Sequence, residues 1–165
     1  MNSFLIGILI GRFLENFMRK VDFMADLKYS IPTHCFDEPD DKTLRITVSI
    51  PGIKKESIFR LKMCLPRIDS GSSNGYLNVV FENRGVKLQF IGQREMKLKN
   101  FYLNVVDLPH NVDIANCKTK VLNNSVQLYL RKDSPGLWMN ELMEGLKTVD
   151  PDIEPPPPYD EKSQI

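Results

Sequence analysis

Cysteine is sparse in this chain, where Cys35, Cys64 and Cys117 are the only three among 165 residues. They are odd in number and none forms a C-x-x-C pair, so neither a disulfide framework nor a zinc ribbon is expected. Reduced, partly buried thiols are the expected state, which is typical of a cytoplasmic protein.

Histidine is equally scarce, with His34 and His110 as the two examples. His34 adjoins Cys35, but successive strand residues point to opposite faces, so the two cannot share one metal ion. His110 lies near Asp107 and Asp113, which leaves a metal or acid–base role as a minor alternative. The chain also lacks a glycine-rich phosphate loop, a nucleophile elbow and a metalloprotease helix. We therefore expect no enzymatic activity, no cofactor and no metal site.

Neither sign of charge prevails, since 22 lysines and arginines balance 21 aspartates and glutamates to a net charge of +1. The basic residues stand singly along the chain, which is typical of a solvated surface and predicts no nucleic-acid partner. An apolar content of 42% is enough for one core in a domain of ordinary size.

Long apolar runs are missing as well. The apolar stretch over residues 4–10 is about half of the roughly 20 residues that cross a bilayer, and it lacks the basic flank and cleavage site of a secretory signal. Its periodicity is helical, with apolar residues at Ile6, Ile10, Phe13, Phe17 and Val21. We expect an amphipathic helix over residues 1–25 that packs onto the domain or onto a partner. Two alternatives stay open: residues 1–21 lie in a membrane interface, or the stretch is disordered or a gene-model extension.

Short alternating strands separated by turn residues make up the middle of the chain. Leu44, Ile46, Val48 and Ile50 alternate with polar residues before Pro51-Gly52. Hairpins are expected at Glu82–Gly85, with Gly85 at positive φ, and at Asn123-Asn124. The same pattern predicts strands over Leu27–Phe36, Leu44–Ile50, Ile58–Met63, Tyr76–Phe81, Val86–Ile91, Leu98–Leu108, Cys117–Leu122 and Val126–Arg131. The regular spacing predicts an all-β fold, an antiparallel β-sandwich of seven or eight strands.

The stretch from Val126 to Trp138 predicts how the sandwich closes. Val126, Leu128 and Leu130 share one face of a strand, and Pro135-Gly136 stops it. Trp138, the only tryptophan, is then expected to fold back against the sheet, and core packing is favoured over a recognition surface. A short helix is expected over Leu137–Leu146.

From residue 147 onward the composition becomes acidic and proline-rich, and no packed core can form from it. We expect a disordered tail over residues 147–165 with polyproline character, after a domain over residues 26–146. Pro156, Pro157 and Tyr159 fit the Pro-Pro-x-Tyr ligand of WW domains, whose preformed helix loses little entropy on docking. The last three residues, 163–165, fit a PDZ-type ligand, but so short a match occurs often by chance.

The closing stretch resembles the end of the CS domain, the β-sandwich module of small co-chaperones and nuclear-movement proteins. The matching residues are Leu128, Leu130, Lys132, Pro135, Gly136, Trp138 and Leu142. The family usually has Trp-Pro where this chain has Trp138-Met139. The stretch from Ile46 to Ile58 is similar both to CS domains and to small heat-shock proteins, which share the sandwich. Residues 105–113 are similar to the CS segment before the last hairpin.

The resemblance implies a binding module without enzymatic activity, a co-chaperone or adaptor. Relatives bind the cytosolic heat-shock chaperone of the ninety-kilodalton class, its client adaptors or dynein-assembly factors. Two alternatives stay open: a holdase of the small heat-shock type, and a membrane-tethered adaptor held by residues 1–21. Candidate contacts with a partner are Lys54, Lys55, Arg131, Lys132 and Trp138, where the basic residues face an acidic chaperone surface. Ordinary solvated lysines are the alternative explanation.

Overall fold

The computed structural model describes residues 27–56, 71–152 and 156 of the chain. Residues Tyr29–Pro156 form one compact unit. Within the described ranges, no helix has the length and apolar character needed to cross a membrane. The helix expected over residues 1–25 and the strand expected over Ile58–Met63 lie outside the described residues, so both stay predictions.

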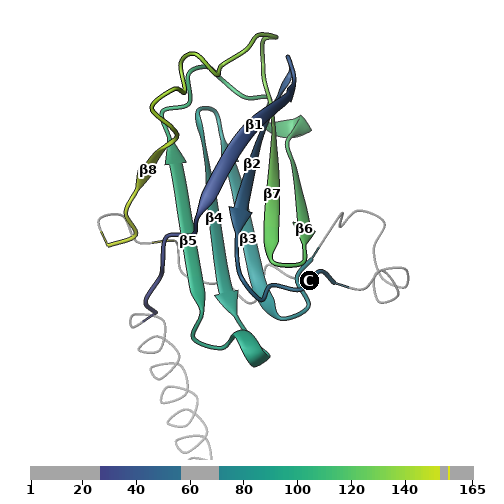
Figure 1. The fold of residues 1–165 in the computed structure, drawn as a ribbon, viewed down its shortest axis with the longest axis vertical. Coiled ribbons are helices and arrows are strands. Elements are labelled where there is room, and N and C mark those ends of the chain that lie inside the picture. Colours follow the sequence, from purple (N-terminus) through teal and green to yellow (C-terminus); the bar gives the residue numbers. More distant parts are fainter. Residues whose placement is uncertain (1–26, 57–70, 153–155, 157–165) are drawn as a thin grey trace, which may run out of the picture. The chain divides into compact units, whose positions relative to one another are not determined.

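Two four-stranded antiparallel sheets make up the described unit (Figure 1). The strand order is β1-β2-β7-β6 in the first sheet and β3-β4-β5-β8 in the second. The predicted all-β sandwich is therefore confirmed. The strands are β1 (His34–Asp40), β2 (Thr43–Ser49), β3 (Gly75–Glu82), β4 (Gly85–Gly92), β5 (Asn100–Val106), β6 (Lys118–Leu122), β7 (Ser125–Arg131) and β8 (Lys147–Val149), with short 3-10 turns η1 (Arg94–Met96) and η2 (Ile114–Asn116).

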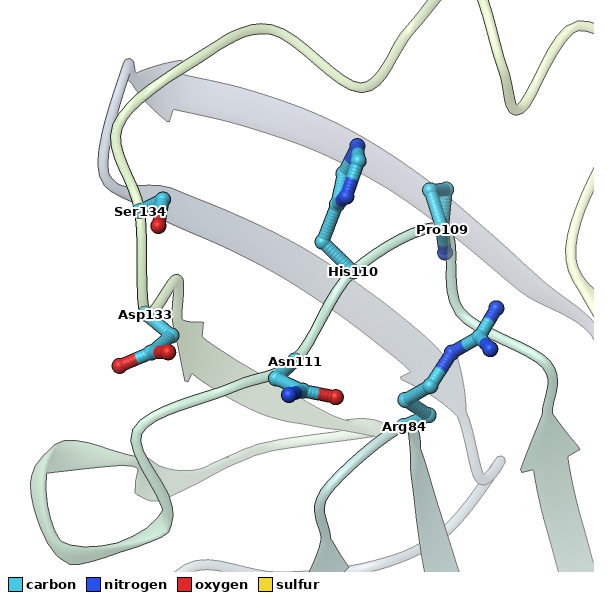
Figure 2. Close-up of a pocket in the computed structure, with 6 residues that line it drawn as sticks. All are labelled: Arg84, Pro109, His110, Asn111, Asp133 and Ser134. Carbon is cyan, nitrogen blue, oxygen red and sulfur yellow. The ribbon is translucent and has the colours of Figure 1, made fainter.

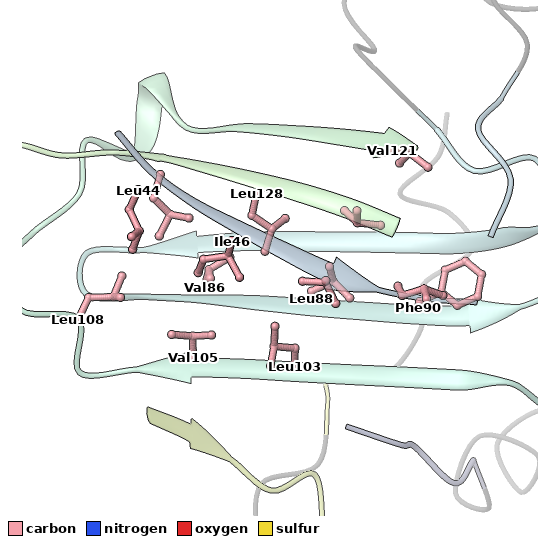
Figure 3. Packing of buried hydrophobic residues seen from close by; sticks show 14 of the residues in the cluster. Leu44, Ile46, Val86, Leu88, Phe90, Leu103, Val105, Leu108, Val121 and Leu128 are labelled. Carbon is pink, nitrogen blue, oxygen red and sulfur yellow. The ribbon is translucent and has the colours of Figure 1, made fainter. Parts of the chain in front are cut away.

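One hydrophobic core fills the space between the sheets (Figure 3). The antiparallel register places Ile46 of β2 opposite Leu128 of β7, and Leu88 of β4 opposite Leu103 of β5. Burying one such side chain contributes about 1.5–3 kcal/mol. The strand residues that belong to this core and are fully buried are Leu44, Ile46, Val48, Val86, Leu88, Phe90, Leu103, Val105, Val121, Val126, Leu128 and Leu130. The two-residue alternation predicted for β2 and β7 is confirmed.

Both expected hairpins form, although Gly85 has a different purpose from the one expected. Its φ is not positive. A Cβ at Gly85 would lie 2.5 Å from the carbonyl oxygen of Val105 in β5, so the position requires a residue without a side chain. At the other hairpin, Asn124 has a φ of 68°, and its Oδ1 accepts a hydrogen bond from the N–H of Gly52 (2.9 Å). The β6–β7 turn is thereby tied to the loop after β2.

The segment expected as a first strand, Leu27–Phe36, is divided between the two sheets. Ser30 forms an isolated parallel bridge with Phe101 of β5. The strand β1 begins only at His34 and pairs with β2. Pro32 lies between the two pairings, and because proline has no N–H it cannot continue a ladder. The first strand was therefore predicted in the right region but with the wrong start.

The strand expected from Leu98 begins two residues later, at Asn100 of β5. Leu98 has a φ of 71°, outside the extended region, and its side chain is exposed. The left-handed backbone turns this leucine away from the sheet. It lies in the connection that follows η1.

The chain after β7 differs from expectation in two places. Leu137–Leu146 forms turns rather than a helix: the N–H of Leu142 donates to Trp138 O, and that of Gly145 to Leu142 O (both 2.9 Å). Gly145, at a φ of 91°, cannot continue a right-handed helix. Lys147–Val149, expected in the disordered tail, forms β8 on the edge of β5. Pairing with β5 supplies hydrogen-bond partners for the backbone N–H and C=O groups of β8. The acidic, proline-rich composition of the residues that follow does not prevent it.

Candidate binding surface

A buried ion pair holds the segment that follows β7. The side chains of Lys132, directly after β7, and Glu38, in β1, are 0% and 2% exposed. Phe36 of β1 packs against the core, and the pairing of β1 with β2 becomes irregular between Asp37 and Asp40, the stretch that contains Glu38. The Lys132 ammonium donates to the Glu38 carboxylate and to the carbonyl oxygen of Gly136. Burying a charge is costly unless it is paired and hydrogen-bonded. Here the ammonium of Lys132 and the carboxylate of Glu38 are each other's partner.

Trp138 completes this cluster. Its backbone N–H donates to Oε1 of Glu38 (2.7 Å), and the N–H of Met139 donates to Oε2 (3.2 Å). Nζ of Lys132 lies 5.1 Å from the centroid of the indole ring, within the range of a cation–π contact. The indole is buried in the core, as the sequence predicted. We call Glu38, Lys132 and Trp138 the buried lock.

The carboxyl of Glu38 is ionised within the buried lock. Burial by itself raises the pKa of this group, because desolvation penalises the charged form. The hydrogen bonds from the Lys132 ammonium and the Trp138 N–H, together with the positive charge of Lys132, outweigh burial and lower the pKa of Glu38 below its ordinary value. The lock is therefore fully formed at neutral pH.

The buried lock fixes a segment that exposes apolar side chains to solvent. Trp138 and Leu142 are buried, whereas Leu137, Met139 and Met143 are 68%, 45% and 83% exposed. The two buried residues thus fix the position of the three exposed ones. We call residues 137–143 the presenting segment. Exposed large apolar side chains mark interaction sites, and methionine adapts to apolar partners of varied shape. The arrangement is suited to binding another polypeptide.

A polar pocket of about 290 Å³ opens beside the presenting segment (Figure 2). Nε of Arg84 donates to Leu108 O (2.7 Å), which fixes the guanidinium at the β3–β4 turn. Nε2 of His110 lies 3.0 Å from Oε1 of Glu141, a residue of the turns that follow Trp138. The lining residues are Arg84, Pro109, His110, Asn111, Asp133 and Ser134. In Figure 2 the labelled side chains point in different directions rather than toward one centre.

The acidic residues considered as neighbours of His110 are engaged elsewhere. Asp107 lies 3.8 Å from the ammonium of Lys147. Asp113 accepts a hydrogen bond from Nδ2 of Asn116 (2.6 Å). Across the described residues, no group of three or more His, Cys, Asp and Glu side chains could hold a metal ion. The minor alternative of a metal site at His110 therefore finds no support in the geometry.

The five predicted contact residues do not form one surface. Lys132 and Trp138 are buried in the lock, so neither is accessible to a partner, and their predicted role as surface contacts is wrong. Arg131 is half-buried at the end of β7. Lys54 and Lys55 are exposed in the loop after β2, at the end of the sandwich away from the lock (Figure 1). Of the tail residues, Pro156 is half-buried, and Pro157 and Tyr159 lie outside the described part of the chain.

Sequence reasoning missed Glu38 and the presenting segment. Glu38 belongs to a cluster of turn-forming acidic residues, and nothing local pairs it with a lysine 94 positions away. The structural residues predicted from the closing stretch do lie where expected. Leu128, Leu130 and Leu142 are buried with Trp138, and Pro135-Gly136 turns the chain after Lys132, with Gly136 at a φ of 149°.

The chain has a weak structural similarity to a solved protein. No model of a known protein family matches this chain, and no match is found among curated proteins. Among solved structures, heat shock protein 16.0 from Schizosaccharomyces pombe is similar to the chain, with a TM-score of 0.45 and 14% sequence identity. The alignment covers 66% of this chain and 71% of that one. The assignment to the β-sandwich class rests on the strand pairing described above.

Proposed function

We propose that this protein is a non-enzymatic protein-binding module, a co-chaperone or adaptor of the CS type. The observation that carries the proposal is the presenting segment, where the buried lock displays Leu137, Met139 and Met143 to solvent. A lysine, a Pro-Gly turn and a tryptophan, the residues that suggested the CS resemblance, build this device. The partner we propose is the cytosolic heat-shock chaperone of the ninety-kilodalton class or one of its clients.

A direct binding measurement tests the proposal. Purified full-length chain is titrated with the chaperone and, separately, with a destabilised client protein. The Leu137→Ser/Met139→Ser/Met143→Ser variant should bind at least about tenfold more weakly, because hot-spot apolar contacts contribute more than 1 kcal/mol each. Val80→Ser/Ile114→Ser is the matched control, since both side chains are exposed apolar residues on other elements. Equal affinities of the two variants, or no binding by the natural chain to either partner, would refute the proposal.

A holdase of the small heat-shock type is the second candidate. It is favoured by exposed apolar side chains beyond the presenting segment, among them Ile31, Val80 and Leu98. Such scattered surface can retain an unfolding chain in a less specific way. The size of the protein in solution separates the candidates, because a holdase of this type assembles into large oligomers and an adaptor of this size stays small. The tail at Pro156, Pro157 and Tyr159 is proposed to recruit a WW-domain protein in either case.

A further inference from the structure

An exposed leucine lies between two lysines in the connection from β4 to β5. Leu98 is 75% exposed, and its φ of 71° is a conformation that leucine rarely adopts. Arg94, in the same connection, also has a positive φ, of 52°. Backbone strain of this kind is found mainly where a binding or switching role requires it. Here it keeps an apolar side chain on the surface.

Basic residues from two loops lie at the same end of the sandwich as the connection that carries Leu98. Lys54 and Lys55 belong to the loop after β2, and Nζ of Lys54 lies 2.7 Å from Oε1 of Glu95 in η1, which joins the two loops. Figure 1 shows both loops at the same end of the sandwich, away from the chain that follows β7. We call the following residues the basic end: Lys54, Lys55, Arg94, Lys97, Leu98 and Lys99.

The positive charge of the basic end is largely uncompensated. Glu95 is engaged by Lys54, whose hydrogen bond lowers the pKa of that carboxyl to about 2. For the other four cations, Lys55, Arg94, Lys97 and Lys99, no ion pair is present within the described part of the chain. Glu56 and Asp69 are the other acidic residues of these two loops in sequence. In a chain with a net charge of only +1, this is a strong local excess.

The described chain enters the domain beside the basic end. The N–H of Ser30 donates to the carbonyl oxygen of Asn100 (2.9 Å), the residue that follows Lys99. In sequence, residues 1–26 combine the apolar stretch 4–10 with three cations and three acids, Arg12, Arg19, Lys20, Glu15, Asp22 and Asp26.

We propose that the basic end docks on an anionic phospholipid bilayer. The lysines and arginine contact headgroup phosphates, while Leu98 enters the boundary between headgroups and acyl chains. An exposed apolar side chain that lysines flank in sequence, Lys97 and Lys99, matches a surface that is anionic outside and apolar beneath. An acidic protein would satisfy the cations and leave Leu98 without a partner. Docking in this way is a function beyond protein binding. With the basic end on the bilayer, the presenting segment, at the other end of the sandwich, would face away from the membrane.

Flotation of the full chain with lipid vesicles tests the proposal. Vesicles containing about a third phosphatidylserine are compared with vesicles of phosphatidylcholine alone. Lys97→Glu/Lys99→Glu should lower the partition coefficient on the anionic vesicles at least 25-fold, at about fivefold per basic residue lost. Leu98→Asn should lower it about fivefold through the lost apolar contact. Asparagine tolerates the left-handed backbone, so this variant keeps its fold.

The matched control is Lys118→Glu/Lys120→Glu on β6, where both lysines are exposed and the change in net charge is the same. It should retain the binding of the natural chain to within a few-fold. Equal losses in the two lysine pairs would show that binding follows net charge, and would overturn the proposal. The proposal would also be overturned if the natural chain did not float with the anionic vesicles. If Leu98→Asn bound as well as the natural chain, the surface would be an electrostatic one for an acidic partner and not a lipid-docking site.

Discussion

Neutralising one partner of the buried lock should destabilise the fold far more than neutralising both. Glu38→Gln leaves the Lys132 ammonium, which is 0% exposed, without its carboxylate. Lys132→Met leaves the Glu38 carboxylate buried with only two backbone N–H donors, those of Trp138 and Met139. Breaking a buried pair from one side costs about 3–5 kcal/mol. We expect each single variant to lose about 3 kcal/mol of unfolding free energy.

The double variant Glu38→Gln/Lys132→Met carries no buried charge. A glutamine can still accept the hydrogen bond that the Trp138 N–H gives to Oε1, and a methionine fills most of the lysine volume. Replacing a buried ion pair by neutral residues is often close to neutral. We therefore expect the double variant to lose only about 1–2 kcal/mol, well below the sum of the single losses, which gives a coupling energy of several kcal/mol.

Urea denaturation measures these free energies. Trp138 is the only tryptophan, so its fluorescence reports directly on the lock. The matched control is Asp37→Asn, which breaks the ion pair between Asp37 of β1 and Arg45 of β2, where both side chains are partly exposed. It should change stability by less than about 1 kcal/mol. Additive losses in the double variant, or single losses no larger than that of the control, would refute the reasoning.

Two further predictions concern pH and the β6–β7 turn. The pKa of Glu38 is lowered in the folded state, so its contribution to stability is present above the unfolded value of about 4.3 and is lost as pH falls through the lower folded value. The urea midpoint of the natural chain should thus fall more steeply between neutral and acidic pH than that of Glu38→Gln, and parallel curves would contradict the assignment. Asn124→Ala should destabilise by about 2 kcal/mol in urea titrations, from the left-handed backbone and the lost bond to Gly52 N. Asn124→Gly, which keeps the backbone freedom, should lose about half as much.

Features with local causes were predictable from the sequence. The alternation of Leu44, Ile46 and Val48 requires only a strand with one buried face, and the same kind of pattern predicted β7; that the two strands pair is shown by the structure alone. The Asn123-Asn124 turn follows from the tolerance of asparagine for left-handed backbone. The burial of Trp138 followed from a strand, a Pro-Gly stop and one large ring that needed a place in the core.

Features that depend on distant contacts were not predictable. Glu38 and Lys132 lie 94 positions apart, so their pairing was not predicted and the lysine was expected on the surface. The outward turn of Leu98 depends on its backbone φ, which composition does not encode. Lys147–Val149 adds to the edge of β5 although the residues after it are acidic and proline-rich. For Glu38 and for Lys147–Val149, the deciding partner lies far along the chain.

Amide hydrogen exchange of the full chain, with and without the bound chaperone or destabilised client, tests most directly whether the presenting segment does the binding. The account predicts that protection on binding is concentrated in residues 137–146, with little change at the pocket that Arg84 and His110 line. Protection confined to other elements, with residues 137–146 exchanging at the same rate in the free and bound states, would contradict it.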